Sequence, residues 1–279
     1  MASRALLRGI LRSPSGLVGS ALIACMLLIA FIGPELLRID PSAPDLSAKL
    51  RPPSREHWFG ADELGRDVLS RVVYGARMSL TITILGVVGS LVVGSALGLL
   101  AGFRGGAWEM AIMQLVEMLM AMPGFLLALL AIAVLGIGVQ NLIASLAIQS
   151  IPVFARVAHA ATLSVREMEF IQAAQSIGAT ERRIMVRELV PNIMSPLLVQ
   201  ATLRLATTLL LASSLSFLGL GVQPPQPEWG AMLSGGRAYV SAAPHVILFP
   251  GLAIMVTTLG FNLMGDALRD TLDPRYRRE

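Results

Sequence analysis

The side chains that most often carry out chemistry are few in this chain and lie far apart. Lys49 is the only lysine of the 279 residues, and no glycine-rich run precedes it, whereas the Walker loop that cradles nucleotide phosphates needs a lysine directly after such a run. His57, His159 and His245 fall in three separate segments, and Cys25 is the single cysteine. Neither a metal-ligand cluster nor an intrachain disulfide is therefore expected. We expect the chain not to be an enzyme and to bind no metal, ATP or other cofactor itself.

Two charged residues stand within stretches that are apolar enough to enter a lipid bilayer. They are Glu117 and Arg204, and an ionisable residue inside a membrane is by default a functional candidate. Glu117 is a candidate for proton coupling, or it bonds a neighbouring helix such as the one that bears Arg204. The structural alternative is favoured over the proton-coupling one.

The elements that must position these residues are long apolar stretches. A bilayer core of about 30 Å is crossed by about 20 apolar helical residues. The stretch 118–155 is too long for one crossing and must turn back near Gly136, which raises the number of expected spans to six. The stretches with almost no formal charge are 13–34, 78–103, 118–155, 189–227 and 238–265.

Composition and charge support this fold class. Hydrophobic residues make up 54% and charged residues 14% of the chain, against about 25% charged residues in ordinary soluble domains. Arginines gather before the first stretch, between 156 and 187, and after the last stretch. Because cytoplasmic segments of membrane proteins are enriched in basic residues, we expect both termini to be cytoplasmic and lipid to surround the spans. The alternative, that the arginines bind nucleic acid or anionic lipid, is less favoured because they sort by loop.

The predicted architecture is an all-α polytopic membrane protein with six transmembrane helices. Residues 1–76 hold an N-terminal cytoplasmic tail, a first helix at about 16–37 and a long extracytoplasmic loop. Residues 77–268 form the main domain, with a cytoplasmic loop at 161–192, and 269–279 form a cytoplasmic tail. The remaining helices are expected at about 78–103, 109–135, 141–160, 194–216 and 245–266.

Small residues recur every four positions in the second span. They form overlapping GxxxG steps, which let two helix backbones approach closely in a membrane. Contact with another helix of the same chain is favoured over contact with a second subunit. In the third span, Pro123 is expected to kink the helix. The small residues are Gly86, Ser90, Gly94, Gly98 and Gly102.

The cytoplasmic loop between the fourth and fifth spans has the pattern of two short helices. Ser164 and Glu167 have the spacing of a capping box, which predicts a helix through 168–177 that Gly178 ends. A second helix is expected from Thr180 and must stop before Pro191. The first helix has an apolar face at Phe170, Ala174 and Ile177, beside Ile171. Such a face predicts a docking surface for a partner, and the alternative is that it folds back onto its own chain.

This loop resembles the EAA loop of permeases from binding-protein-dependent ABC importers. The segment EFIQAAQSIGATERRIMVRELVPN carries the motif, although a glutamine stands where the family has an acid. Segments 57–80, 216–233 and 261–275 are similar to the dipeptide, oligopeptide and nickel branch, whose second permease is the C-type subunit. The residues that the resemblance assigns to ATPase docking are Glu169, Phe170, Gln172, Ala173, Ala174, Ile177, Gly178 and Pro191.

The resemblance implies a type-1 ABC importer transmembrane domain in the inner membrane. Such a permease forms half of a translocation pore with a homologous second permease. Two cytosolic ATPase subunits, which use ATP and Mg²⁺, grip the docking loops, and an extracytoplasmic binding protein delivers the substrate. Peptides are the expected substrate, with nickel or nickel-chelate complexes as the alternative. Gly178 is the expected hinge of the docking loop.

The extracytoplasmic segments 57–71 and 216–237 are the candidates for facing the binding protein. Within them we single out Asp62, Glu63, Glu228 and Trp229. Membrane anchoring of the aromatic residues is the alternative at this point. An ATP-independent secondary transporter or a channel subunit would be a different class of protein, but secondary transporters usually show repeated halves, and none is evident here.

Overall fold

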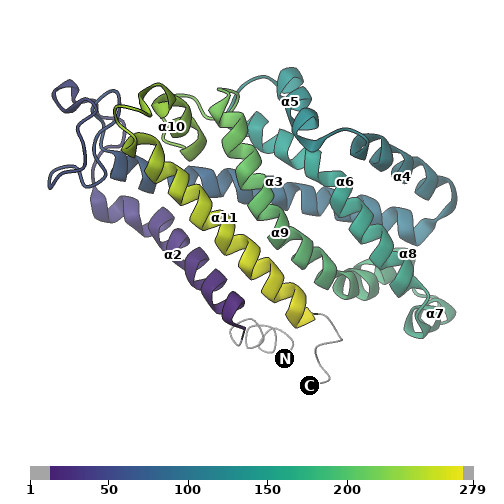
Figure 1. Ribbon diagram of the computed structural model, residues 1–279. Coiled ribbons are helices and arrows are strands. Elements are labelled where there is room, and N and C mark those ends of the chain that lie inside the picture. Colours follow the sequence, from purple (N-terminus) through teal and green to yellow (C-terminus); the bar gives the residue numbers. More distant parts are fainter. Residues whose placement is uncertain (1–12, 273–279) are drawn as a thin grey trace.

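The computed structural model describes residues 13–272, and its regular elements over that range are helices (Figure 1). Of the expected cytoplasmic tails, residues 1–12 and 273–279 lie outside the described residues, and residues 269–272 of the expected tail 269–279 belong to the last helix. The main helices are α2 (Pro14–Leu37), α3 (Val68–Arg104), α4 (Gly106–Met120), α5 (Gly124–Leu135), α6 (Val139–Arg166), α7 (Glu169–Ser176), α8 (Glu181–Arg183), α9 (Val190–Phe217), α10 (Trp229–Gly236) and α11 (His245–Leu272). A π-helix, η2 (Ile184–Leu189), precedes α9, and short 3-10 turns are η1 (Leu46–Ala48) and η3 (Arg237–Tyr239).

Within residues 13–272, five helical segments are long and apolar enough to cross a membrane, or six spans result if α4 and α5 count together as one. We expected a single kinked span at 109–135. Instead α4 and α5 are bent by 98° where the chain reaches Pro123, which has no backbone N–H to continue a helix. Their 15 and 12 residues extend about 22 and 18 Å, each less than the bilayer core. The third span is therefore a broken pair rather than one kinked helix.

Helix α3 starts earlier than its apolar stretch suggested. Asp67 caps its N-terminus by accepting a hydrogen bond from the Ser70 amide at 2.7 Å, so the helix begins at Val68 and not near 78. The expected boundary between 76 and 77 consequently falls inside α3. The extra turns include Arg71, whose guanidinium is paired with Asp62 (Nε to Oδ2, 3.3 Å). This ion pair offsets the free-energy cost of burying a charged side chain in the helix.

Helices α3 and α6 lie side by side for most of their length (Figure 1), and the row of small residues is the contact. A Cβ atom added to Gly94 would stand 2.6 Å from the Ile151 carbonyl oxygen, and one on Gly98 would overlap the carbonyl oxygen of Ala155. Gly86 and Gly102 meet α6 in the same way, and Ser90 is fully buried. Of the two alternatives for this row, the contact within the chain is the one formed.

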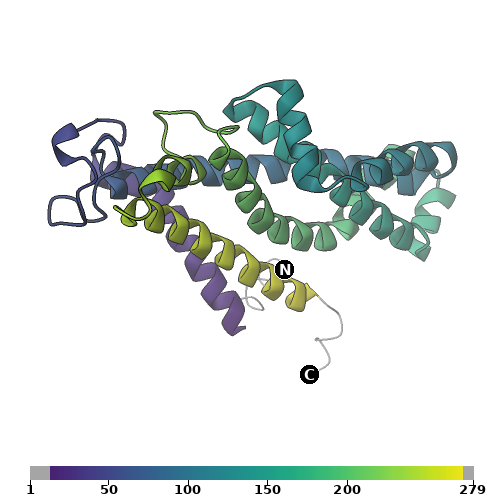
Figure 2. The same cartoon turned by 45° about the horizontal axis from the view of Figure 1, so that its top comes forward.

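The remaining helices pack around this pair. Helix α9 contacts α3 and α6, and α11 joins α9 to α2. At the contact of α2 with α11, a Cβ atom on Gly19 would lie 2.7 Å from the Met264 amide nitrogen. Figure 2 shows α2 and α11 running together and diverging from α3 and α6.

Gly98→Ala is expected to lower the free energy of unfolding by about 2 kcal/mol, because the new methyl group meets a backbone carbonyl that cannot move aside. Gly89→Ala is the matched control, since its Cβ atom would lie 3.4 Å from that of Ala147, an ordinary contact. Alanine also favours a helix over glycine by about 1 kcal/mol, so the control should be neutral or stabilising. Thermal unfolding of the purified variants in detergent measures the difference, and equal effects would contradict the close packing.

Candidate functional site at each end of the helical bundle

Two groups of residues lie at opposite ends of the long helices (Figure 1). One, the α7 end, comprises residues 167–189. The other, the loop end, comprises residues 38–67 together with 218–228. Within residues 13–272, no group of three or more His, Cys, Asp or Glu side chains is placed to hold a metal ion.

Helix α7 begins later than the capping-box pattern predicted. Ser164 lies inside α6, which continues to Arg166, and α7 starts at Glu169 without a side-chain cap. The prediction of a capping box was wrong because Thr162 and Val165 are buried against the bundle, which holds this stretch in the preceding helix. Two residues, Glu167 and Met168, then turn the chain into α7.

The C-terminus of α7 has the geometry expected from its glycine. Gly178 has φ +76°, and the Ala179 amide donates to the Ala174 carbonyl at 3.1 Å, as in a Schellman-type end. A Cβ atom on Gly178 would meet nothing within 4 Å. Any effect of a substitution here therefore comes from the backbone rather than from a clash.

Gly178→Val is expected to weaken coupling by disturbing the turn after α7, because a β-branched residue at positive φ costs about 1–2 kcal/mol. ATPase activity of the assembled complex, divided by substrate taken up, measures coupling, and this ratio should rise severalfold. A Gly178→Val complex with the wild-type ratio would count against Gly178 as the hinge.

The apolar face of α7 is divided between the chain itself and solvent. Ile171 is fully buried and packs in a cluster with Ile184 and Leu189. Phe170 and Ile177 are 39% and 82% exposed. Gln172 and Ala173 are exposed as well, and Ala174 is half-buried. One side of α7 thus anchors the loop to its own bundle, and the other side is left open.

The second short helix does not stop before Pro191. Thr180 caps α8 by accepting from the Arg183 amide at 3.4 Å, and the chain then passes through the π-helix η2 directly into α9. The Val190 amide donates to the Met185 carbonyl, five residues back. Pro191 then occupies the first turn of α9. A backbone N–H at that position has no partner within the helix, so its absence in proline costs no hydrogen bond. The predicted stop was wrong for this reason.

One side-chain contact ties the α7 end to α3, and two others beside it join α6 to α3 and to α4. Arg104 pairs with Glu181 of α8 at 3.3 Å. Arg166 donates to the Gly102 carbonyl at 2.8 Å, which satisfies the end of α3. His159 and Glu109 join α6 to α4 at 2.8 Å. By these side-chain contacts the α7 end is joined to α3, α3 is joined to α6, and α6 is joined to α4.

The intramembrane charged residues are not paired with each other. Glu117 is exposed on α4 and Arg204 is half-buried in the middle of α9. Neither side chain makes a hydrogen bond or an ion pair within residues 13–272. The suggested bond from Glu117 to the helix that bears Arg204 is thus not formed within these residues.

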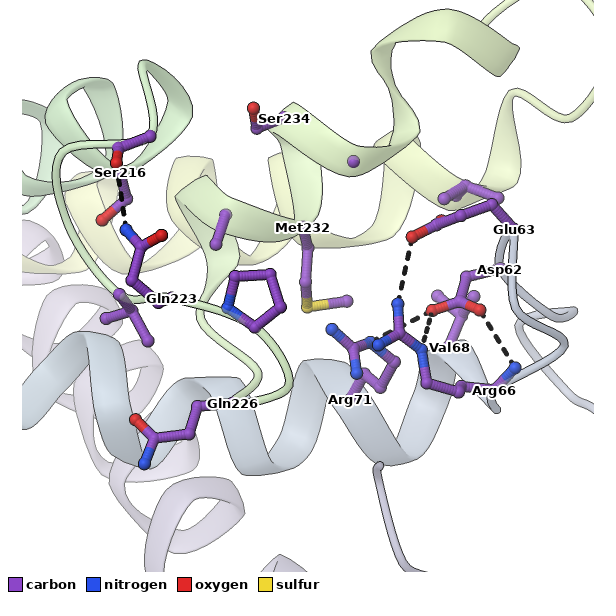
Figure 3. A pocket seen from close by; sticks show the side chains of 16 residues that line it. Asp62, Glu63, Arg66, Val68, Arg71, Ser216, Gln223, Gln226, Met232 and Ser234 are labelled. Carbon is purple, nitrogen blue, oxygen red and sulfur yellow. Dashed lines mark hydrogen bonds and ion pairs between the residues drawn. The ribbon is translucent and has the colours of Figure 1, made fainter. Parts of the chain in front are cut away.

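At the loop end, a network of charged side chains fastens the loop to α3 (Figure 3). Arg66 donates from Nε to Oδ2 of Asp62 at 2.7 Å and from Nη2 to Oε1 of Glu63 at 3.0 Å. Arg71 of α3 reaches the same Asp62 oxygen at 3.3 Å and donates to the Pro41 carbonyl at 2.9 Å. Asp62, Arg66 and Arg71 are 3%, 6% and 6% exposed. Asp62 is the centre of this buried network.

Glu228 and Trp229 connect the second loop to α3. The Glu228 carboxylate caps α10 by accepting from the amides of Gly230 and Ala231, and it also accepts from Ser79 Oγ at 3.1 Å. Trp229 donates from Nε1 to the Val72 carbonyl at 2.9 Å. Both residues are buried, and this burial raises the pKa of the Glu228 carboxyl above its usual range.

These positions correct the expectation for the binding-protein face. Asp62, Glu228 and Trp229 are buried inside the chain, so the prediction that they contact a partner was wrong, and so was membrane anchoring by Trp229. Glu63 remains partly exposed, with 24% of its side chain accessible. It borders a cavity of about 280 Å³ that Gln223 and Gln226, both exposed, also line (Figure 3). The signal missed in the sequence was an acid directly before a short helix, which is an N-cap pattern.

Comparison with known proteins agrees with this arrangement. The family model of the binding-protein-dependent transport system inner membrane component matches residues 94–278. The dipeptide transport system permease protein DppC of Alkalihalophilus pseudofirmus is 44% identical over 261 residues, covering 94% of this chain and 86% of that protein. The glutathione transport system permease protein GsiD of Escherichia coli is 50% identical over 225 residues, covering 81% and 74%.

The fold has a solved counterpart in an inward-facing structure of the MetNI methionine ABC transporter. That similarity has a TM-score of 0.57 at 19% identity and covers 73% of this chain and 97% of the other. This solved structure shows the fold, and the family model and the permease relatives show the class, which is a permease of the ABC importer type. The chain belongs to the family of binding-protein-dependent transport system inner membrane components. It is thus a multi-pass inner membrane permease subunit.

Proposed function

We propose that this chain forms one half of the translocation pore of an ATP-driven peptide importer. The observation that carries the proposal is its similarity, over 94% and 81% of its length, to permeases named for dipeptide and glutathione transport. Glutathione is itself a short peptide, so both names point to one substrate class. A homologous second permease would complete the pore.

The ATPases would dock on the exposed side of α7. Phe170 and Ile177 present apolar surface there, and the basic residues Arg182 and Arg183 of the following helix α8 are exposed as well. Apolar anchors surrounded by charge are typical of protein interfaces. The chain has no Walker loop of its own, so ATP and Mg²⁺ would be bound by two separate cytosolic subunits. On this proposal the α7 end and both termini would lie in the cytoplasm.

The loop end would then face the extracytoplasmic binding protein. Its accessible groups include Glu63, Gln223, Gln226 and Trp58, of which Trp58 is 70% exposed. The buried network at Asp62 keeps these loops in one shape, which a docking partner requires. ATP binding would bring the ATPases together and shift the docked α7, and the contacts at Arg104 and Arg166 would pass that shift to the spans. In free-energy terms, the ATPases bias a two-state helical bundle.

The test is uptake by the purified complex of both permeases, both ATPases and the binding protein in liposomes. A labelled dipeptide should accumulate only when ATP is enclosed on the α7 side, and removal of the binding protein should abolish uptake. Accumulation without ATP would assign the chain to a secondary transporter or a channel. Active complex that accumulates no peptide would contradict the proposed substrate.

A further inference from the structure

One face of α9 carries polar side chains where other helices expose apolar ones. Gln200, Thr207 and Ser214 recur every seven residues and so share one side of the helix; the last two are exposed and Gln200 is half-buried. On α3, Leu85 and Val92 are also seven residues apart and share one side of the helix, and they are 48% and 63% exposed. This apolar face of α3 is suited to contact with lipid.

On α9, Leu210 (47% exposed) lies between Thr207 and Ser214, and the two hydroxyls donate to the Arg204 and Leu210 carbonyls of α9 itself. What this polar face offers to water or to other polar groups is therefore the hydroxyl oxygens, as acceptors, and the Gln200 amide.

Arg204 adjoins this face near the middle of α9. It follows Gln200 by four residues and precedes Thr207 by three, which are the spacings of neighbours on a helix surface. Its side chain is half-buried and has no hydrogen bond or ion pair with any of the residues 13–272. Glu117, the acid suggested from the sequence as its partner, makes no hydrogen bond or ion pair with these residues either. An arginine withdrawn from water without a counter-charge is strongly unfavourable, so its counter-charge is expected to come from outside this part of the chain.

The guanidinium group favours one kind of counter-charge. Its planar fork of N–H donors matches the two oxygens of a carboxylate. Every unmodified peptide ends in one carboxylate whatever its sequence, so a single arginine can serve many peptides. Gln200 and Thr207 stand on either side of Arg204 and offer further hydrogen-bonding groups to a peptide backbone.

We infer that Arg204 binds the C-terminal carboxylate of the peptide in transit along the polar face of α9. The inference rests on the proposed function as a peptide importer and identifies a substrate contact within the membrane. An acid of the second permease is the competing source of the counter-charge, and it would make Arg204 an assembly contact instead.

The test compares ATP-driven uptake of trialanine with that of trialanine amide by the assembled complex. Arg204→Gln should lower the acid-to-amide uptake ratio about tenfold relative to wild type, because only the acid loses a charge-assisted hydrogen bond. Arg204→Lys keeps a point charge without the fork and should lower the ratio about threefold. Arg269→Gln, which removes the same charge from an exposed position in the last turn of α11, should leave the ratio unchanged. Copurification of the subunits monitors assembly.

Equal losses for both peptides in Arg204→Gln, or an unchanged ratio, would overturn the inference and leave the proposed function intact. If that variant does not assemble, Arg204→Lys decides: a lowered ratio supports the inference, and a wild-type ratio contradicts it. Wild-type complex that takes up neither peptide would overturn the proposed function and the inference together.

Discussion

Asp62→Asn is expected to lower the free energy of unfolding by about 3 kcal/mol, the largest stability effect of any single substitution considered. The substitution removes the one negative charge shared by Arg66 and Arg71, whose atoms lie 2.7 and 3.3 Å from it. Both arginines are almost fully buried, and removing one partner of a buried ion pair typically costs 3–5 kcal/mol. Thermal unfolding of the purified permease in detergent measures the effect.

Glu63→Gln is the matched control for this prediction. It removes a neighbouring carboxylate that also contacts Arg66, at 3.0 Å, but whose side chain is partly exposed. Pairs open to solvent contribute about 1 kcal/mol or less, so the control should unfold almost as the wild type does. Equal destabilisation by the two substitutions would mean that Asp62 is not the centre of the network.

Ile177→Asp is expected to reduce ATP-driven uptake more than tenfold without changing the free energy of unfolding. The side chain is 82% exposed and thus contributes little to the stability of the permease alone. A charge placed in the centre of an apolar docking contact typically costs 2 kcal/mol or more of binding free energy. Binding of the ATPase subunit to detergent-solubilised permease, measured directly, should weaken by a similar factor.

Ile137→Asp is the matched control, because it places the same aspartate at an exposed isoleucine outside the α7 end. Ile137 is 56% exposed in the turn between α5 and α6 and has no part in the α7 end. ATPase binding to this variant should match that of wild type. If both aspartates weaken binding alike, the effect is general rather than local, and α7 is not the docking surface.

The membrane character and the contact between α3 and α6 were accessible from sequence because each depends on local periodicity. Apolar length indicates a span directly, and small residues every four positions indicate a close helix contact, as at Gly94 and Gly98. The left-handed turn at Gly178 was predictable for the same reason, since only the residue itself and its neighbours decide it.

The loop end was not accessible in this way, since its contacts join residues far apart in the chain. Ser79 meets Glu228, and Val72 meets Trp229, across about 150 residues. Charged residues are ordinarily expected to be exposed. At the loop end several are buried instead, because each of these is paired with a buried partner. The opposite charges at Asp62 and Arg66, four residues apart, were the one local hint of pairing.

The bend at Pro123 and the continuation of the helix through Pro191 were not predicted from the sequence, because the effect of a proline on a helix depends on the hydrogen bonds around it. Pro123 separates two helices at 98°, while Pro191 sits at the start of α9 and interrupts nothing. The difference lies in the π-helical hydrogen bonds before Pro191, and a single-residue rule cannot anticipate them.

The central claim is that ATPases drive this permease through the exposed side of α7. Crosslinking from a cysteine placed at Ile177, in a Cys25→Ser background that removes the only native thiol, tests it most directly in intact cells. The account predicts a crosslink from Ile177→Cys to the ATPase subunit, and protection from a membrane-impermeant thiol reagent added outside. Labelling from outside together with no crosslink to the ATPase would contradict both the orientation and the docking surface.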